Sequence, residues 1–310
     1  MASGSRPSTQ AWPWHRIVGV IDLKAGRAVA AIAGDRDTYR SVTFDDHSPA
    51  SAYPNADSEN ASSDRLNPGS KPVGARCFAP THCKTCQAMS TQVTYAKFPV
   101  DGCYECLTKH YLAIGLNQIY VADLDALCGG SRQWTTLGHL LNILPAGTTC
   151  IVDAGWSLND VDSVDAAFLH QVVQNQIRLI WILASESIKD VTTLDRCVRS
   201  LPKIVVPALG LDFADGQFRG NGEPSSWIAK SDQLGICNGL VLDVRTVGCR
   251  GGLMATNQFL ACHQRAQHWR WLSGGGVNTA SDVLTWIDIG CEAVLVATAL
   301  SPKFGHPHHK

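Results

Sequence analysis

Short apolar runs alternate with longer amphipathic stretches along most of the chain. The runs are continuously apolar, which is typical of parallel strands that are covered on both faces. The stretches between them, such as Thr136–Leu144, Ile188–Leu201 and Ser281–Ile289, have the spacing of helices that bury one face. The predicted strands are Arg16–Leu23, Gln118–Ala122, Thr149–Val152, Leu179–Leu183, Ile204–Leu209, Gly239–Leu242, Trp269–Leu272 and Ala293–Val296.

Eight such strand–helix units predict an α/β fold, a closed (β/α)8 TIM barrel rather than an open doubly wound sheet. Residues 48–99 are rich in Ser, Asn, Pro, Ala and Gly, which indicates a long loop insertion after the first strand. The end of the chain, Ser301–Lys310, contains two prolines, so the last helix is expected to be truncated or missing. We therefore expect a flexible tail over 1–15, a barrel domain over 16–302 and a second flexible tail over 303–310.

Four pairs of segments repeat in the same order and predict a barrel built of two similar half-barrels. In the first pair, IDLKAG and LDFADG, an Asp near a strand end is followed by a Gly four residues later. Asp22 and Asp212 are then expected on opposite sides of one barrel mouth, where enzymes of this fold carry their chemistry. The pairs are Ile21–Gly26 with Leu211–Gly216, Val121–Leu127 with Val241–Val247, Asp153–Ser157 with Gly274–Asn278, and Ile182–Ile188 with Leu295–Ser301.

The composition and charge of the chain indicate which classes of binding partner are not expected. The 310 residues carry a formal net charge of −1 and are 45% hydrophobic, without a basic cluster, so neither nucleic acid nor a membrane is expected as the main partner. No apolar run approaches the ~18 residues of a membrane span. The N-terminus lacks the apolar core of a signal peptide. We expect a cytoplasmic monomer or small homo-oligomer whose twelve cysteines are mostly reduced thiols.

The chain resembles the family of the phosphoribosylformimino-aminoimidazole-carboxamide-ribotide isomerase of histidine biosynthesis and its cyclase relative. The resemblance is carried by VIDLKAGRAV, IYVADLDAL, GLDFADGQ, LSGGGVNTASDV and VLVATAL, and covers about 16–48 and 102–301. It implies a two-fold barrel without metal or organic cofactor that catalyses an Amadori-type rearrangement of an aminoaldose to an aminoketose. It also implies that aspartates ending strands 1 and 5, here Asp22 and Asp212, exchange protons with the sugar.

Two carboxyl groups suit that chemistry. Opening the aminosugar ring needs a proton on the ring oxygen, and moving the double bond needs a proton removed from C2, so one carboxyl must be protonated while the other is ionised. The alternative is that each Asp only caps a turn. The symmetric placement of the pair favours catalysis by Asp22 and Asp212.

Glycines near the end of the chain predict a phosphate site. Gly274, Gly275 and Gly276 follow the seventh strand and precede a helix that opens at Thr279 or Ala280, so bare backbone N–H groups could approach a phosphate. A tight turn is the alternative interpretation. Ala297 and Thr298 would complete the cup, and further substrate contacts are expected from Asp123, Asp243 and Arg245.

The first half departs from the family pattern, which has a second glycine cup there. Only Gly155 remains of the glycine run, and Trp156 adds bulk. Asp153 and Glu186 add negative charge that would repel a phosphate, and these motifs contain no arginine. The tryptophan that usually follows strand 5 is replaced by RGNGE. We therefore expect one phosphate cup, in the second half, and a first-half pocket for a neutral or cationic group. Replacing Gly275 by a bulky residue should weaken phosphate binding, whereas replacing Glu186 should not.

Four cysteines have the spacing of a zinc site. Cys83-x2-Cys86 and Cys103-x2-Cys106 are separated by sixteen residues, which matches a zinc ribbon that would staple the insertion. Alternatively, Cys103 and Cys106 lie on the first barrel helix and pack as small hydrophobes.

The sequence thus predicts an isomerase acting on a phosphorylated, ribosyl-containing small molecule, either the histidine-pathway enzyme or a close paralogue. Two alternatives stay open. One is a relative linked to methanopterin-dependent one-carbon metabolism with a single-phosphate substrate. The other is a catalytically silent barrel that binds a ligand.

Overall fold

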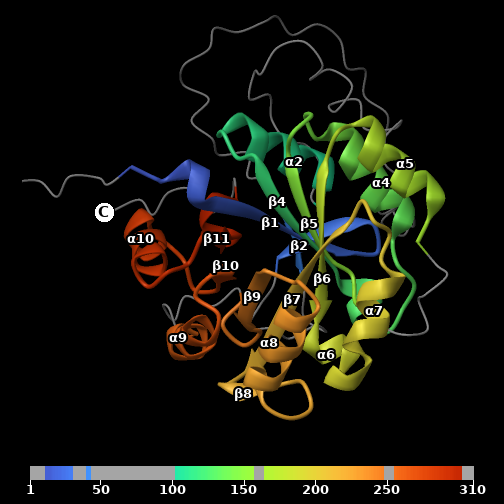
Figure 1. Ribbon diagram of the computed structural model, residues 1–310. Coiled ribbons are helices and arrows are strands. Elements are labelled where there is room, and N and C mark those ends of the chain that lie inside the picture. The colour runs from blue at the N-terminus through green and yellow to red at the C-terminus, as the bar shows by residue number, and fades with distance from the viewer. Residues whose placement is uncertain (1–10, 31–39, 43–101, 157–163, 248–254, 302–310) are drawn as a thin grey trace, which may run out of the picture.

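Eight parallel strands close into a barrel in the computed structural model, which describes residues 11–30, 40–42, 102–156, 164–247 and 255–301 (Figure 1). The last strand pairs with the first, with Ile17 beside Val294, so the sheet closes on itself as predicted. In barrel order the strands are β1 (Ile17–Lys24), β4 (Gln118–Asp123), β5 (Thr149–Asp153), β6 (Arg178–Ala184), β7 (Val206–Ala214), β9 (Asn238–Asp243), β10 (Arg270–Gly274) and β11 (Ala293–Val296).

Two of the barrel strands continue beyond the mouth into antiparallel hairpins, which the sequence did not predict. β1 pairs with β2 (Arg27–Ala30), which pairs with β3 (Arg40–Ser41), and β7 pairs with β8 (Gln217–Phe218). Both hairpin turns use two residues with positive φ, Ala25 and Gly26 in the first and Asp215 and Gly216 in the second. The sequence repeat is therefore a repeat of structure, in which each strand runs two residues past its aspartate.

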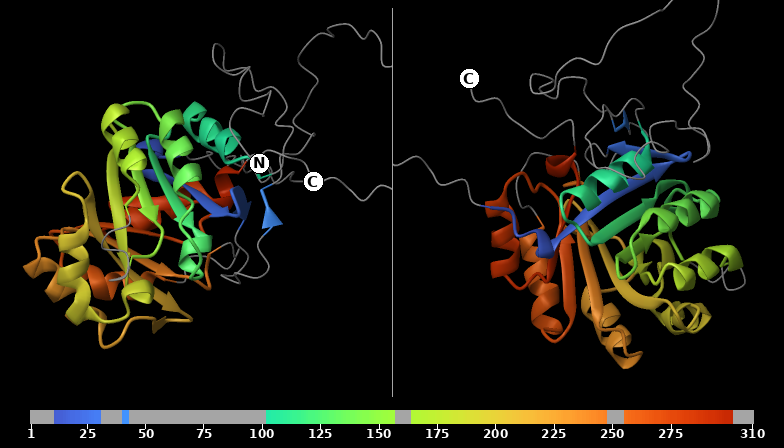
Figure 2. Two further views of the ribbon diagram at one scale, coloured as in Figure 1. Left: turned by 90° about the vertical axis from the view of Figure 1, so that its right-hand side faces the viewer. Right: turned by 90° about the horizontal axis from the view of Figure 1, so that it is seen from above.

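Helices cover the outside of the barrel (Figure 2). Two of the three predicted helices match within two residues. The stretch Ile188–Leu201 is not one helix, because Lys189 has a φ of 63° and ends the first turn. Ile204 lies in a turn and is 41% exposed, so β7 begins two residues later than predicted. The main helices are α2 (Tyr104–Ala113), α4 (Trp134–Ile143), α5 (Ala166–Gln174), α7 (Leu194–Ser200), α8 (Pro224–Gln233), α9 (Thr256–Arg265) and α10 (Ala280–Asp288).

Shorter helical turns follow several strands: α3 (Leu124–Leu127), α6 (Ser185–Ile188) and the 3-10 helices η4 (Val191–Thr193) and η5 (Thr298–Leu300), with η1 (Trp14–Arg16) before β1. None of the helices in the described part of the chain is long and apolar enough to span a membrane. The predicted insertion at 48–99, residues 1–10 of the first tail, the second tail and any helix after Ser301 lie outside the described residues. The described end of the first tail is not irregular throughout, because η1 begins at Trp14.

Alternation along each strand divides the apolar core into two layers. One set of side chains, including Tyr120, Ile151 and Ile182, fills the barrel lumen. The other set, including Trp181 and Trp271, packs between strands and helices. Because of this alternation, only some of the polar residues near the strand ends face the lumen. Those residues are the candidates for the active site.

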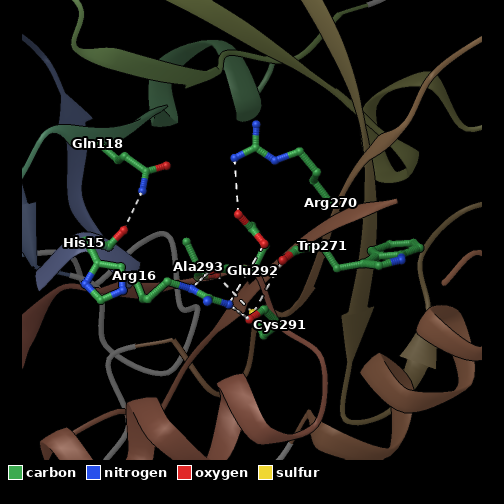
Figure 3. A network of polar contacts seen from close by, with 8 residues as sticks. All are labelled: His15, Arg16, Gln118, Arg270, Trp271, Cys291, Glu292 and Ala293. Carbon is green, nitrogen blue, oxygen red and sulfur yellow. Dashed lines mark hydrogen bonds and ion pairs between the residues drawn. The ribbon is translucent and has the colours of Figure 1, made fainter. Parts of the chain in front are cut away.

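Arg16 ties the first strand to the last at the end of the barrel opposite the mouth (Figure 3). Its Nη2 donates to the carbonyl of Cys291 at 2.9 Å, its Nε donates to the carbonyl of Glu292, and the Glu292 carboxylate lies 4.0 Å from Nη2. Arg270 reaches the same carboxylate at 3.4 Å from a more exposed position. In barrels of this type the amino-terminal face contributes stability rather than catalysis.

We expect Arg16→Met to lower the free energy of unfolding by roughly 1–3 kcal/mol, because two carbonyls lose a charged donor. Arg270→Met is the matched control and should cost less than about 1 kcal/mol, since its ion pair is solvent-exposed. Urea unfolding at neutral pH measures both values. Equal losses in the two variants would contradict a special role for Arg16 at the β1–β11 seam.

Candidate active site

Asp22 and Asp212 lie near the carboxyl ends of β1 and β7, and hence at the same mouth of the closed barrel. Asp22 is 8% exposed and Asp212 is 5% exposed. Each stands an even number of residues from a lumen-filling neighbour, Val18 on β1 and Ala208 on β7, so both carboxyls face the lumen. The geometry that the repeat predicted is present, and the catalytic roles remain a prediction.

The two carboxyl groups have different surroundings. Burial raises the pKa of Asp22 to about 7. Asp212 accepts hydrogen bonds on Oδ2 from the Ser185 hydroxyl at 3.1 Å and from the Glu186 N–H at 3.2 Å. The Ser185 oxygen in turn accepts the Asp212 N–H at 3.0 Å, so β6 and β7 are locked together beneath this carboxylate. Paired carboxyls in unlike environments are the arrangement that divides acid and base roles between two residues.

A third lumen carboxyl, Asp153 on β5, lies close to the pair. It is 5% exposed, and its Oδ2 accepts a hydrogen bond from the Tyr120 hydroxyl at 2.9 Å. Burial, with smaller contributions from Asp212 and Glu186, raises the pKa of Asp153 to about 8, although the Tyr120 hydroxyl and the Gly155 N–H act in the opposite direction. Its Oδ1 is buried and accepts no hydrogen bond from the described residues.

Tyr120 is influenced by all three carboxyls and is hydrogen-bonded to one of them, Asp153. Burial raises its pKa well above the usual value, and Asp153, Asp22 and Asp212 each raise it further, so all three are near the phenol. Sequence analysis treated Asp153 only as a repulsive charge and missed Tyr120. The signal was the alternation of the strands, since Asp153 is two residues beyond Ile151 and Tyr120 is two residues before Ala122, all in the lumen layer or facing it.

The predicted phosphate cup follows β10 and β11. Gly275 and Gly276 have φ values of +97° and +68°, which glycine adopts without strain. Within the described part of the chain, the N–H groups of Gly276, Thr298 and Ala299 donate no hydrogen bond. These donors are available for an anion, beside Gly274 and Ala297 at the ends of the two strands.

The expected contribution of α10 to that cup stays a prediction. The helix does begin at Ala280, with Thr279 as its N-cap. The Asp282 carboxylate, however, already accepts the N–H groups of Asn278 at 2.8 Å and Thr279 at 2.9 Å. The N–H groups just before this helix are therefore used within the protein, and the other cup donors come from the glycine turn and η5.

Asp123 and Asp243 hold the two hairpin turns through different contacts. Asp243 accepts the N–H of Gly216 at 2.7 Å and of Asp215 at 3.2 Å. Asp123 accepts the side-chain amide of Gln133 at 2.8 Å, and the Gln133 oxygen accepts the Gly26 N–H at 2.6 Å.

Arg245, grouped with these aspartates as a substrate contact, lies 3.8 Å from the exposed carboxylate of Asp215. The structure thus gives Asp123 and Asp243 a supporting role in the walls of the mouth. Substrate contacts by Asp123, Asp243 and Arg245 stay a prediction.

One expectation about the first-half loop is wrong. Trp156 is fully buried and donates to the Ser200 hydroxyl at 3.0 Å, so its ring packs under α7 and adds no bulk to the mouth. The two motifs contain no arginine, but Arg132, from another segment of the chain, donates to the carbonyls of Ala154, at 3.0 Å, and Gly155. Its guanidinium lies 5.0 Å from the Trp156 ring centroid, a cation–π contact that fixes the loop.

The predicted zinc site can be compared with the structure only at two of its four cysteines, because Cys83 and Cys86 lie outside the described residues. Cys103 is the N-cap of α2, where its sulfur accepts the Cys106 N–H at 3.4 Å, and Cys106 is fully buried in the core. No three His, Cys, Asp or Glu side chains of the described ranges are grouped as a metal site would require. A zinc site made by all four cysteines stays a prediction.

Comparison with known families and proteins gives one match. The model of a family described as histidine biosynthesis protein matches residues 86–304, which is most of the chain and includes seven of the eight barrel strands. In a comparison with curated proteins, none matches the chain.

Proposed function

Since the chain belongs to the family of histidine biosynthesis proteins, we propose that it is a barrel isomerase that converts a phosphorylated aminoaldose to the aminoketose. The observation that supports this best is the lumen pair Asp22 and Asp212, two buried carboxyls in unlike environments at one mouth. The substrate class is a ribosyl-containing small molecule bound through one phosphate.

The proposed reaction needs only proton transfers by these two groups. One carboxyl protonates the ring oxygen as the bond between C1 and that oxygen breaks, and the nitrogen lone pair forms an iminium at C1. The other carboxyl removes the C2 proton, which gives an enaminol. That carboxyl then returns the proton to C1, while the C2 hydroxyl gives its proton to the first carboxyl, so the ketone forms at C2 and both carboxyls regain their starting states. A pKa of about 7 allows Asp22 to exchange a proton in either direction near neutral pH.

A single phosphate in the second half is supported by the distribution of donors. Gly276, Thr298 and Ala299 have N–H groups that are not used within the described chain. In the corresponding place of the first half, the Glu186 N–H is bonded to Asp212, and the Glu186 carboxylate would repel a phosphate. Arg132 does not offset that charge, since it is bonded to backbone carbonyls.

Turnover tests the proposal directly. The protein should be incubated with the family's two-phosphate aminoaldose and with an N-aryl ribosylamine 5-phosphate, which has one phosphate, and the aminoketose detected by chromatography. Turnover of the single-phosphate compound is expected to be the faster of the two. Conversion of neither compound, by protein that still binds inorganic phosphate, would contradict the isomerase proposal.

Phosphate binding can be tested independently at η5. Thr298→Asp places a carboxylate where the proposed dianion sits and should weaken binding of inorganic phosphate by at least about tenfold, measured by calorimetry. Glu186→Gln is the matched control in the first half and should not weaken it. This pair is preferable to changes at Gly275, where a Cβ would lie 2.3 Å from the Thr246 hydroxyl and would disturb the turn itself. A stronger effect of Glu186→Gln would contradict the placement.

A further inference from the structure

Asp153 and Tyr120 form a polar pair in the lumen that the proposed proton transfers do not use. Tyr120 satisfies one carboxylate oxygen, and the other, Oδ1, is buried without a hydrogen-bond partner of normal geometry among the described residues. The Gly155 N–H acts on the same carboxyl, but it makes no hydrogen bond of normal geometry. A buried polar atom left unpaired costs free energy, and native structures tolerate it mainly where a ligand or water completes the site. The pair therefore points to a ligand group in the first half of the mouth.

The side chains around Oδ1 of Asp153 indicate whether the ligand group that binds there is an anion or a cation. Asp22 and Asp212 act electrostatically on the Tyr120 phenol, and Asp212 and Glu186 act on Asp153, so acidic side chains surround the pair. Ala122, the register partner of Asp153 on β4, and the lumen-facing residue Ile182 on β6 carry no charge that would offset them. An anion would be repelled, whereas a cation would complete the site.

An organic cation fits better than a metal ion. No cluster of three or more potential metal-ligating side chains occurs in the described part of the chain, so these carboxyls are not placed to share one ion. A protonated amine or an iminium needs only one or two acceptors and can donate to Oδ1 while the Tyr120 hydroxyl holds Oδ2.

We propose that Asp153, held by Tyr120, binds a cationic nitrogen of the substrate, so that the substrate carries a basic amine in addition to its phosphate. The inference rests on the proposed function, because the iminium of the rearrangement is such a cation and a nearby carboxylate would stabilise it as it forms. It adds a specificity residue that distinguishes basic from non-basic amino sugars.

Binding of the cation should also release a proton. In the empty site burial keeps Asp153 largely protonated at neutral pH. An arriving ammonium favours the carboxylate, so the proton leaves to buffer. Tyr120, Asp22, Asp212 and Glu186 are the other titratable groups that act on the pair, and only Asp153 has a buried oxygen without a partner.

Two matched series of ligands test the inference: ω-aminoalkyl phosphates with three to six carbons, and n-alkyl phosphates of the same lengths. At the best length, the amine should tighten binding to the wild-type protein by at least about tenfold, as expected for a charged hydrogen bond. Calorimetry in two buffers of different ionisation enthalpy should show about one proton released on binding of the amine, and none with the alkyl phosphate.

Asp153→Asn should abolish both the amine-dependent gain and the proton release, while binding the alkyl phosphates within about twofold of wild type. Tyr120→Phe is a second variant with an intact carboxylate, and it should reduce the gain without abolishing it. Glu186→Gln, which removes a neighbouring charge only, should keep most of the gain. If the wild type shows no preference for the amine, or Asp153→Asn keeps it, the inference is overturned.

The outcomes separate this inference from the proposed function. Turnover that depends on Asp22 and Asp212, with no role for Asp153 in amine binding, would leave the isomerase proposal intact and remove the cation site. An amine preference that depends on Asp153, in protein without isomerase activity, would support a cation-binding barrel instead.

Discussion

Asp22→Asn is expected to lower kcat for the aminoaldose by about 10²–10⁴-fold, the range that general acid–base catalysis contributes. The substitution keeps the size of the side chain and removes its ability to exchange a proton. Asp212→Asn should have an effect of the same order, because its carboxylate serves the complementary transfer. Steady-state kinetics together with phosphate binding would separate lost chemistry from lost affinity.

The pH profile provides a sharper criterion for the same residue. With the pKa of Asp22 at about 7, the wild-type kcat/KM should change slope near neutral pH, and that limb should be absent from the residual activity of Asp22→Asn. Asp215→Asn, whose side chain is 79% exposed in the second hairpin, is the control and should stay within about twofold of wild type. An unchanged limb in Asp22→Asn would mean that another group titrates there.

Asp153→Asn is expected to stabilise the protein at pH 8 by roughly 2–4 kcal/mol. The pKa of Asp153 is 3.8 in the unfolded chain and about 8 in the folded protein. At a pH between these two values, the unfolded chain has released the proton that the folded protein still holds. The unfolded state then binds fewer protons, so raising the pH through this window favours unfolding. Asparagine has no such linkage and can still accept the Tyr120 hydrogen bond.

Urea unfolding at pH 4 and at pH 8 measures this linkage. The variant should resemble wild type at pH 4 and exceed it at pH 8, and Asp195→Asn on the surface of α7 should show no such difference. If Asp153→Asn is equally destabilising at both pH values, folding does not raise the pKa of this carboxyl. A gain in stability on removing a polar side chain is typical of residues retained for function.

Patterns local to the sequence predicted most of the barrel. Continuous apolar runs located the eight strands, and the repeat placed Asp22 opposite Asp212. Local patterns failed where the apolar spacing does not reveal the backbone conformation or a contact with a distant residue. The helix over Ile188–Leu201 is broken because Lys189 has a left-handed backbone, which nothing in its apolar periodicity indicates.

The candidate site shows the same division. The direction of the Trp156 ring depends on a hydrogen bond to Ser200, which is 44 residues away, and the position of Arg132 depends on carbonyls that follow a different strand. Asp282 resembles an ordinary surface residue until the helix geometry shows that it caps α10. The Asp153–Tyr120 pair was accessible in principle, because strand alternation alone places both side chains on the lumen side.

The way the two hairpin turns are held has a consequence for the ancestry of the molecule. The first turn is fastened by Asp125, which accepts the Ala25 N–H at 2.9 Å, and by Gln133, and the second is fastened by Asp243. Each of these hydrogen bonds joins two residues of the same half-barrel. A chain break in the connection between β6 and β7 would sever none of them, so each half holds its own hairpin turn, as a module that once assembled with a second copy of itself would have had to do. The bonds from Ser185 and Glu186 to Asp212 join the two halves instead.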